Sequence, residues 1–205
     1  MLVDGIEFSF PEDWETAKYD DWVFYRNRFQ SVGDGQKAID IATKDPDNTL
    51  WLIEVKDYRK HRRTKVTDIA DEVALKVRDT MASLLATAVN ADGSEKTKAK
   101  KFIRINKIRI VLQLEQPRDH SKLFPRVIDP ADVKQKLRKS VRAIDPHPMV
   151  TEAKRYSRQG NERLIDLPAP VCSANEALTL LFLGKDPDFM TANLVSPISH
   201  PDCAE

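Results

Sequence analysis

The stretch Lys37–Lys56, KAIDIATKDPDNTLWLIEVK, decides the fold of this chain. Two runs rich in apolar and β-branched residues, Lys37–Lys44 and Leu50–Lys56, flank the turn signal Asp45–Thr49, DPDNT. Two such runs joined by so short a loop predict an antiparallel β-hairpin. If Lys44 and Leu50 flank the loop as a cross-strand pair, the register of the whole hairpin is fixed.

This register places charged residues opposite one another inside apolar strands. Asp40 lies opposite Glu54, and the period of two along a strand places Lys56 on the face of Glu54. Two carboxylates on adjacent strands repel unless a cation lies between them, and Mg²⁺ or Mn²⁺ is one such cation. The alternative that stays open is a buried salt-bridge network of the same three side chains without any chemistry.

The rest of the chain alternates between strand and helix patterns. The spacing of apolar residues and the cap signals predict a mixed central sheet flanked by helices, that is, an α/β (α+β) fold. The segment Trp22–Phe29 is predicted as a strand, with a continued helix as the alternative, and Asp92–Lys101 as a turn and lysine-rich loop. The other predicted elements are a strand Ile6–Phe10, a helix Pro11–Tyr19, a helix Thr67–Val89, a strand Ile103–Leu114, a helix Pro130–Ala143 and a last strand Met149–Ala153.

The character of the chain changes near residue 159, which predicts a domain over residues 1–158 and a C-terminal appendage over residues 159–205. Within the appendage, Ser173 caps a short apolar helix that ends near Leu183. That helix is expected either to cover the core or to pair with a second copy of the chain as a homodimer. A protein-interaction scaffold is therefore one hypothesis for the function.

Composition excludes several classes of protein. The chain has 205 residues, of which 41% are hydrophobic and 32% charged, so it is neither collagen-like nor disordered. No apolar stretch approaches the roughly 18 residues of a membrane helix, and no basic start precedes an apolar segment. Two cysteines are too few for a disulfide framework. These features predict a cytoplasmic protein with no membrane partner.

The net charge of +1 conceals a segregation of charge along the chain. Residues 1–55 carry −7 and residues 159–205 carry −5, whereas residues 56–109 carry +8 and residues 110–158 carry +5. A basic middle can present a positive surface to nucleic acid in a chain that is nearly neutral overall. The predicted nucleic-acid-binding residues follow the hairpin, and two further basic clusters lie later in the chain: Arg59, Lys60, Arg62, Arg63 and Lys65, then Lys96, Lys98, Lys100 and Lys101, then Lys134, Lys136, Arg138, Lys139 and Arg142.

Asp40 followed by Glu54, Val55 and Lys56 resembles the catalytic signature of the PD-(D/E)XK phosphodiesterases, the restriction-endonuclease-like nucleases. The resemblance covers about residues 10–115 and implies a restriction-endonuclease-like αβββαβ core. The proline that this family often has before its first acid is replaced here by Ile39.

The resemblance also implies an activity and a set of roles. It implies a divalent-metal-dependent nuclease, a phosphodiester hydrolase acting on DNA more than on RNA. Asp40 and Glu54 would hold Mg²⁺ or Mn²⁺, and Lys56 would position the attacking water. A further catalytic acid would come from the first helix, with Glu15 and Glu12 as the candidates. The alternative is a catalytically inactive nucleic-acid-binding or protein-interaction module on the same fold.

Overall fold

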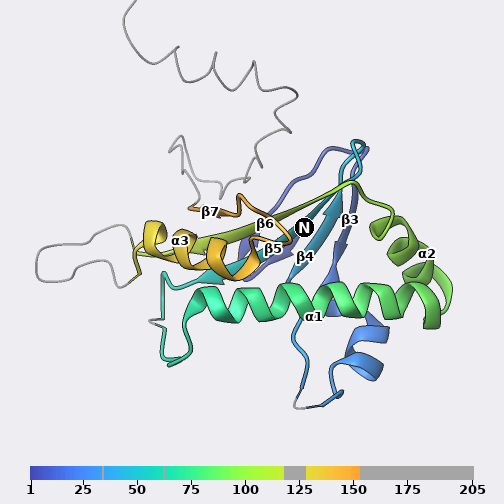
Figure 1. The fold of residues 1–205 in the computed structure, drawn as a ribbon, viewed down its shortest axis with the longest axis horizontal. Helices are drawn as coiled ribbons and strands as arrows, with labels where there is room; N and C mark the ends of the chain where they lie inside the picture. Colours follow the sequence, from blue (N-terminus) through green and yellow to red (C-terminus); the bar gives the residue numbers. More distant parts are fainter. Residues whose placement is uncertain (34, 62, 118–127, 153–205) are drawn as a thin grey trace, which may run out of the picture. The chain divides into compact units, whose positions relative to one another are not determined.

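The computed structural model describes residues 1–33, 35–61, 63–117 and 128–152 (Figure 1). Its centre is a five-stranded sheet in the order β3-β4-β5-β6-β7. β4 pairs antiparallel with β3 and β5, whereas β6 runs parallel to β5 and β7 parallel to β6. The predicted mixed sheet with helices is confirmed. The strands are β3 (Glu15–Lys18), β4 (Ile41–Lys44), β5 (Thr49–Asp57), β6 (Lys107–Glu115) and β7 (Met149–Thr151).

The hairpin has the register that the sequence predicts. β4 pairs with β5 through Lys44 and Leu50 next to the turn and through Ile41 and Ile53 at the far end. The carboxylate of Asp45 holds the turn, because it accepts the backbone N–H of Thr49 at 2.8 Å and the Nε1–H of Trp51 at 2.9 Å. Asp45 is buried, so these two hydrogen bonds satisfy a carboxylate that has lost its water.

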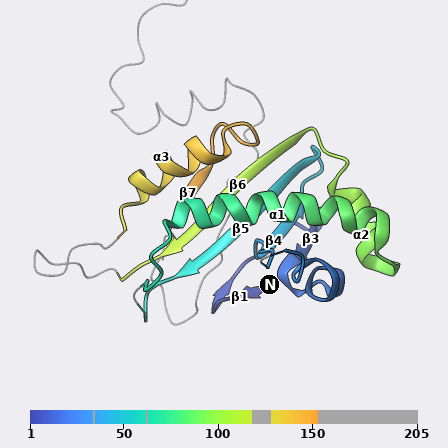
Figure 2. The same cartoon turned by 60° about the horizontal axis from the view of Figure 1, so that its bottom comes forward.

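Three helices cover one face of the sheet. They are α1 (Ile69–Asn90), α2 (Gly93–Phe102) and α3 (Pro130–Val141). α1 and α2 connect β5 to β6, and α3 connects β6 to β7. Both connections move across the sheet in the same direction, and connections between parallel strands are right-handed, so all three helices lie on the same face. Figure 2 shows α1 lying across the strands, with α2 near its C-terminal end. The predicted helices Thr67–Val89 and Pro130–Ala143 are confirmed to within two residues at each end.

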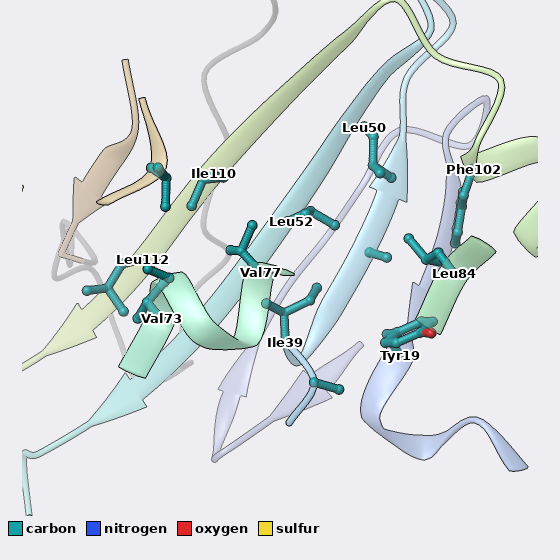
Figure 3. Close-up of a cluster of buried hydrophobic side chains, with 14 of the residues drawn as sticks. Tyr19, Ile39, Leu50, Leu52, Val73, Val77, Leu84, Phe102, Ile110 and Leu112 are labelled. Atoms are coloured by element: carbon teal, nitrogen blue, oxygen red, sulfur yellow. The ribbon is translucent and has the colours of Figure 1, made fainter. Parts of the chain in front are cut away.

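The main core lies between α1 and the sheet (Figure 3). Val73 and Val77 of α1 face Leu52 and Leu112 of the two central strands, and all four side chains are fully buried. Burying side chains of this size stabilises the fold by about 1.5–3 kcal/mol each. The apolar spacing that predicts α1 therefore also identifies the side of α1 that faces the core.

The N-terminal segment packs outside this main core. β1 (Leu2–Val3) and β2 (Ile6–Glu7) form a two-stranded hairpin where the sequence predicts one strand, Ile6–Phe10. A series of neighbouring rings then leads from Phe10 to Trp14 and on to Trp51 of β5, with ring centroids 6.3 and 5.9 Å apart. The odd-numbered face of β5, which carries Trp51, points away from the face that carries Leu52.

The predicted helix Pro11–Tyr19 is wrong. The cap signals at Pro11 produce a single turn, in which the N–H of Trp14 donates to the carbonyl of Pro11 at 3.1 Å. The next residues form β3 instead, because pairing with β4 satisfies their backbone and buries Ala17. The αβββαβ order of a restriction-endonuclease-like core is therefore not confirmed.

The predicted strand Trp22–Phe29 is also wrong, and the helical alternative is closer. A 3₁₀ turn at Tyr19–Asp21 leads into a short helix that ends in a π-helical segment, Tyr25–Phe29. The Glu95 carboxylate accepts the N–H groups of Val23 at 2.7 Å and Phe24 at 3.0 Å and so caps this helix. That cap comes from α2, far away in the sequence, so no local pattern reveals it.

The predicted loop Asp92–Lys101 is wrong as well, because the segment forms α2. The sequence of α2 is rich in lysine, so its apolar face is hard to recognise. This face consists of Ala99 and Phe102, which are three residues apart and both buried. Phe102 stacks on Trp22, with ring centroids 6.0 Å apart. Tertiary packing therefore stabilises a helix that local hydrophobicity does not predict.

The remaining predictions concern the ends of the chain and the membrane. The last two predicted strands are confirmed as the shorter β6 and β7. The predicted helix Ser173–Leu183 and the boundary at residue 159 lie outside the described residues. Among the helices that the structure describes, none is long and apolar enough to cross a membrane. A cytoplasmic location stays a prediction.

We expect Asp45→Ala to destabilise the protein by about 2–4 kcal/mol, because it leaves a buried indole N–H and a buried backbone N–H without their acceptor. Asp47→Ala removes an exposed acid from the same turn and should change the free energy of unfolding by less than about 0.5 kcal/mol. Urea denaturation of the three proteins measures the difference. Equal effects of the two substitutions would contradict the role given to Asp45.

Candidate functional site

The structure brings the predicted hairpin residues together between the sheet and α1. Asp40 directly precedes β4, and Glu54 and Lys56 lie on the side of β5 that faces α1. Glu54 has no exposed surface, and its Oε1 lies 2.7 Å from the Nζ of Lys56. The predicted proximity of these three side chains is therefore correct.

The cation between the two acids is a lysine of α1. The Nζ of Lys76 lies 2.6 Å from Glu54 Oε1 and 3.6 Å from Asp40 Oδ1. The other oxygen of Asp40, Oδ2, accepts the backbone N–H of Val55 at 2.6 Å. An ammonium group therefore occupies the position between the carboxylates where a metal ion is expected from the sequence.

A second acid of α1, Glu72, extends this arrangement towards the loop after β5. Lys56 lies 3.3 Å from Glu72, Arg63 2.9 Å and Lys65 2.8 Å. Burial by itself would raise the pKa of Glu72, but the hydrogen bonds from Lys65 and Arg63 and the charges of Lys56 and Lys65 lower it to about 2. Three cations thus share the carboxylate of Glu72, and one of them, Lys56, lies closer still to Glu54. We call the whole set the charge network: Asp40, Glu54, Lys56, Arg63, Lys65, Glu72 and Lys76.

Glu54 is the least satisfied member of the charge network. Its Oε2 is buried and has no hydrogen-bond partner among the described residues. Burial and then the charge of Asp40 raise the pKa of Glu54 to about 7, against the opposing charges of Lys76 and Lys56. Asp20 has a similar buried oxygen, Oδ1, and burial together with the charge of Asp40 raises its pKa as well.

The fit of a metal ion to these residues is poor. Within the described ranges, no group of three or more His, Cys, Asp or Glu side chains is arranged to hold a metal. A divalent ion between Asp40 and Glu54 would have to displace the ammonium of Lys76. Mg²⁺ or Mn²⁺ as a cofactor, and catalytic roles for Asp40, Glu54 and Lys56, stay predictions.

The acids proposed to complete the site lie elsewhere. Glu15 begins β3 opposite Lys44, whereas Lys18, at the other end of β3, pairs with Ile41 next to Asp40. Three strand positions correspond to about 10 Å along β3. Glu15 Oε2 instead lies 2.7 Å from Lys101 Nζ. The other candidate, Glu12, is exposed in the turn before β3, so neither acid joins Glu54.

The predicted nucleic-acid-binding residues after β5 are largely occupied by acids. Arg59 pairs with Asp57 at 2.7 Å, and Arg63 and Lys65 pair with Glu72. Lys60 is exposed, and residue 62 lies outside the described residues. Two of the three basic clusters lie on different helices, because one is on α2 and another on α3. The sequence therefore overestimates how closely the basic clusters surround Asp40 and Glu54.

α3 carries exposed positive charge on the side away from the core. Its buried residues Val133, Leu137 and Val141 recur at every fourth position and fix which side faces the core. Lys136, on another side, lies 2.6 Å from Asp68, the N-cap residue of α1. The remaining cations are exposed and form no ion pair with any described residue. We call these four the α3 basic face: Lys134, Arg138, Lys139 and Arg142.

Comparison with known proteins finds a similar ligase. The chain is 34% identical over 162 residues to a cysteine--tRNA ligase of Neisseria meningitidis serogroup A. The match covers 62% of this chain but only 23% of that protein, so the chain spans less than a quarter of its relative. No protein-family model matches the chain, and no solved structure matches it.

This relative overturns the resemblance to PD-(D/E)XK enzymes. The predicted family, the nuclease function and the description as a DNA hydrolase are wrong, because the similar protein is a ligase that carries tRNA in its name. The physical reason for the error is that a metal site and a salt-bridge network place the same acids opposite each other on a hairpin. Only the position of Lys76 separates the two interpretations, and that position depends on how α1 packs.

The sequence does contain a signal for Glu72 and Lys76, the two members of the charge network that the hairpin pattern does not predict. The core-facing positions of α1 include Ile69, Val73 and Val77, and Glu72 and Lys76 fall beside them at the same helical spacing. Charged residues at positions that face the core are expensive unless they are paired. A pair of opposite charges on the apolar side of α1 therefore points to partners in the sheet.

We expect Lys76→Ala to destabilise the protein by about 3–5 kcal/mol, because it leaves Asp40 and the buried Glu54 without their shared cation. Arg78→Ala removes an exposed cation from the same helix and serves as the control, with an expected change below about 0.5 kcal/mol. Both values come from urea denaturation at pH 7. If Lys76→Ala is as stable as Arg78→Ala, Lys76 is not the counter-charge of the network.

The stability of the protein should fall between pH 4.5 and pH 8 because of Glu54. Its pKa is raised from 4.5 to about 7 in the folded protein, so the folded state binds this proton more tightly than the unfolded chain does. The contribution is complete below pH 4.5 and is lost as pH rises through 7, by up to about 3 kcal/mol. Glu54→Gln removes this titration.

Urea denaturation of wild type and Glu54→Gln at several pH values between 5 and 8 measures this effect. The free energy of unfolding of the variant, relative to wild type, should increase steadily as pH rises. A difference that is independent of pH would show that the burial of Glu54 does not control its protonation.

Proposed function

We propose that this chain is a tRNA-binding module and that the tRNA it binds is a substrate of a charging reaction. The observation that carries the proposal is the 34% identity to a cysteine--tRNA ligase. Because the chain spans only 23% of that ligase, the proposal concerns tRNA binding and assigns the charging reaction to no residue of this chain.

The α3 basic face supports the proposal because its charges are available. Three of its cations lie on α3 and the fourth, Arg142, is the C-cap residue of α3. Of the described acids nearby, Asp68 pairs with Lys136 and Asp129 caps α3. Exposed Lys and Arg side chains bind phosphates without reading the base sequence and release counterions when they do so. RNA recognised by its shape and its phosphates is the ligand class that such a face fits.

The packing beneath α3 holds this face in place. Lys136 Nζ donates to the Asp68 carboxylate, which also caps α1 by accepting the N–H of Ala70 at 2.8 Å. α1 is in turn tied to β5 by Lys76. In this proposal the charge network serves as a rigid support for the RNA-binding helix and has no reaction to perform.

Neutralising the α3 basic face tests the proposal. The variant Lys134→Gln, Arg138→Gln, Lys139→Gln and Arg142→Gln should weaken binding of unmodified tRNA at least tenfold at 0.1 M salt. Each lost phosphate contact lowers the slope of log K against log salt by about 0.7–0.9, so we expect a slope smaller by about 3. Fluorescence anisotropy over a salt series measures both quantities.

The matched control removes the same number of cations near α2: Lys96→Gln, Lys100→Gln, Arg104→Gln and Lys107→Gln. These residues also lack an ion pair with a described residue, so their loss tests net charge alone. Equal weakening by the two variants would show that tRNA binding is not localised to α3. Binding of duplex DNA with the affinity of tRNA would instead favour DNA, the partner predicted from the sequence.

A further inference from the structure

A cavity separates the segment that enters α1 from the start of α3. It has a volume of about 350 Å³. Ligand sites of proteins are usually about 300–1,000 Å³, so this cavity has room for one small ligand. Arg63 and residues 65–69 form one side and Ile128, Asp129, Asp132, Val133 and Lys136 form the other.

Two lysines on the wall of the cavity are free to exchange partners. The side chains of Lys65 and Lys136 are 60% and 59% exposed, and they pair with Glu72 and Asp68 respectively. The Lys136–Asp68 pair is largely exposed, and exposed ion pairs contribute only about 0–1 kcal/mol, so a phosphate can replace Asp68 at little cost. Glu72 is buried, so drawing Lys65 away from it costs more. Glu72 keeps two other cations when Lys65 leaves it.

Arg63 provides a fixed flat surface in the same cavity. Its side chain is 11% exposed and is held by the hydroxyl of Tyr58 at 2.8 Å and by Glu72 at 2.9 Å. Unpaired RNA bases stack on arginine planes as well as on aromatic rings. The apolar side chains of Ile69, Ile128 and Val133 also line the cavity, so a base would contact carbon on one side and a guanidinium on another.

Two of the three acids in the cavity are used as helix caps. One oxygen of Asp68 and one of Asp129 cap their own helices, by accepting N–H groups of Ala70 and Ala131 at 2.8 Å. Asp132 forms no hydrogen bond or ion pair with a residue that the structure describes. A free carboxylate accepts hydrogen bonds from the exocyclic amino groups of adenine or cytosine.

We propose that this cavity holds one unpaired nucleotide of the RNA, with its phosphate on Lys65 and Lys136 and its base against Arg63 and the apolar wall. The proposal deepens the proposed function and rests on it. The two surfaces share one helix, because Lys136 lines the cavity from one side of α3 and Lys134 and Arg138 lie on another side of α3. Binding of this kind adds recognition of unpaired RNA to a face that binds phosphates alone.

Thr67→Trp tests the cavity without touching its charges. Thr67 lines the cavity and is exposed, so an indole there fills the space while the fold is retained. Thr64→Trp is the matched control, because Thr64 is exposed in the same loop and does not line the cavity. The probes are 5′-AMP, adenosine and inorganic phosphate, followed by ¹H–¹⁵N chemical shifts of the full chain, and intact tRNA, followed by anisotropy.

We expect 5′-AMP to shift residues 65–69 and 128–136 in wild type and Thr64→Trp, and to leave them unchanged in Thr67→Trp. It should bind at least fivefold more tightly than adenosine or phosphate, and Thr67→Trp should weaken tRNA binding about five- to tenfold. Equal binding of phosphate and 5′-AMP, or no effect of Thr67→Trp, would overturn the nucleotide site. If tRNA binding still depends on the α3 basic face, the proposed function survives the failure of the nucleotide site. If 5′-AMP binds in the cavity but tRNA does not bind the chain, the nucleotide site survives and the proposed function fails.

Discussion

The ammonium of Lys76 between the carboxylates of Asp40 and Glu54 is the interaction on which the site depends. It resolves the repulsion between two acids on neighbouring strands and fixes α1 against the hairpin at the same point. Burial makes the arrangement costly to disturb, because removing one member of a buried ion pair leaves an uncompensated charge. The position of α1, and of the helices that pack on it, follows from this contact together with the apolar core.

Electrostatics then decides which cations are available to a ligand. Lys56, Arg63 and Lys65 are drawn towards Glu72, so the basic loop after β5 is mostly used within the protein. The cations of the α3 basic face form no ion pair with a described residue, because the residues of α3 that face the core are the apolar Val133, Leu137 and Val141. The proposed RNA surface is thus one part of the basic middle that forms no ion pair with a described residue.

Local patterns predicted the elements whose stability is mostly local. The register of β4 and β5 follows from two apolar runs and the DPDNT turn, and α1 and α3 follow from caps and helical spacing. β3 and α2 were missed because distant groups stabilise them: pairing with β4 in one case, and the contacts of Phe102 and Glu95 with residues 22–24 in the other. A pattern of a few residues contains no information on such partners.

The sequence by itself determined that Asp40, Glu54 and Lys56 meet on one face of a hairpin, because strand register depends on residues near in the chain. Only the tertiary structure decided what neutralises them. Lys76 is 22 residues beyond Glu54, on a helix whose packing depends on the whole core. A metal ion and a lysine satisfy the same pair of acids, so the sequence pattern led to a nuclease, whereas the folded chain carries its own cation and its similarity is to a tRNA ligase.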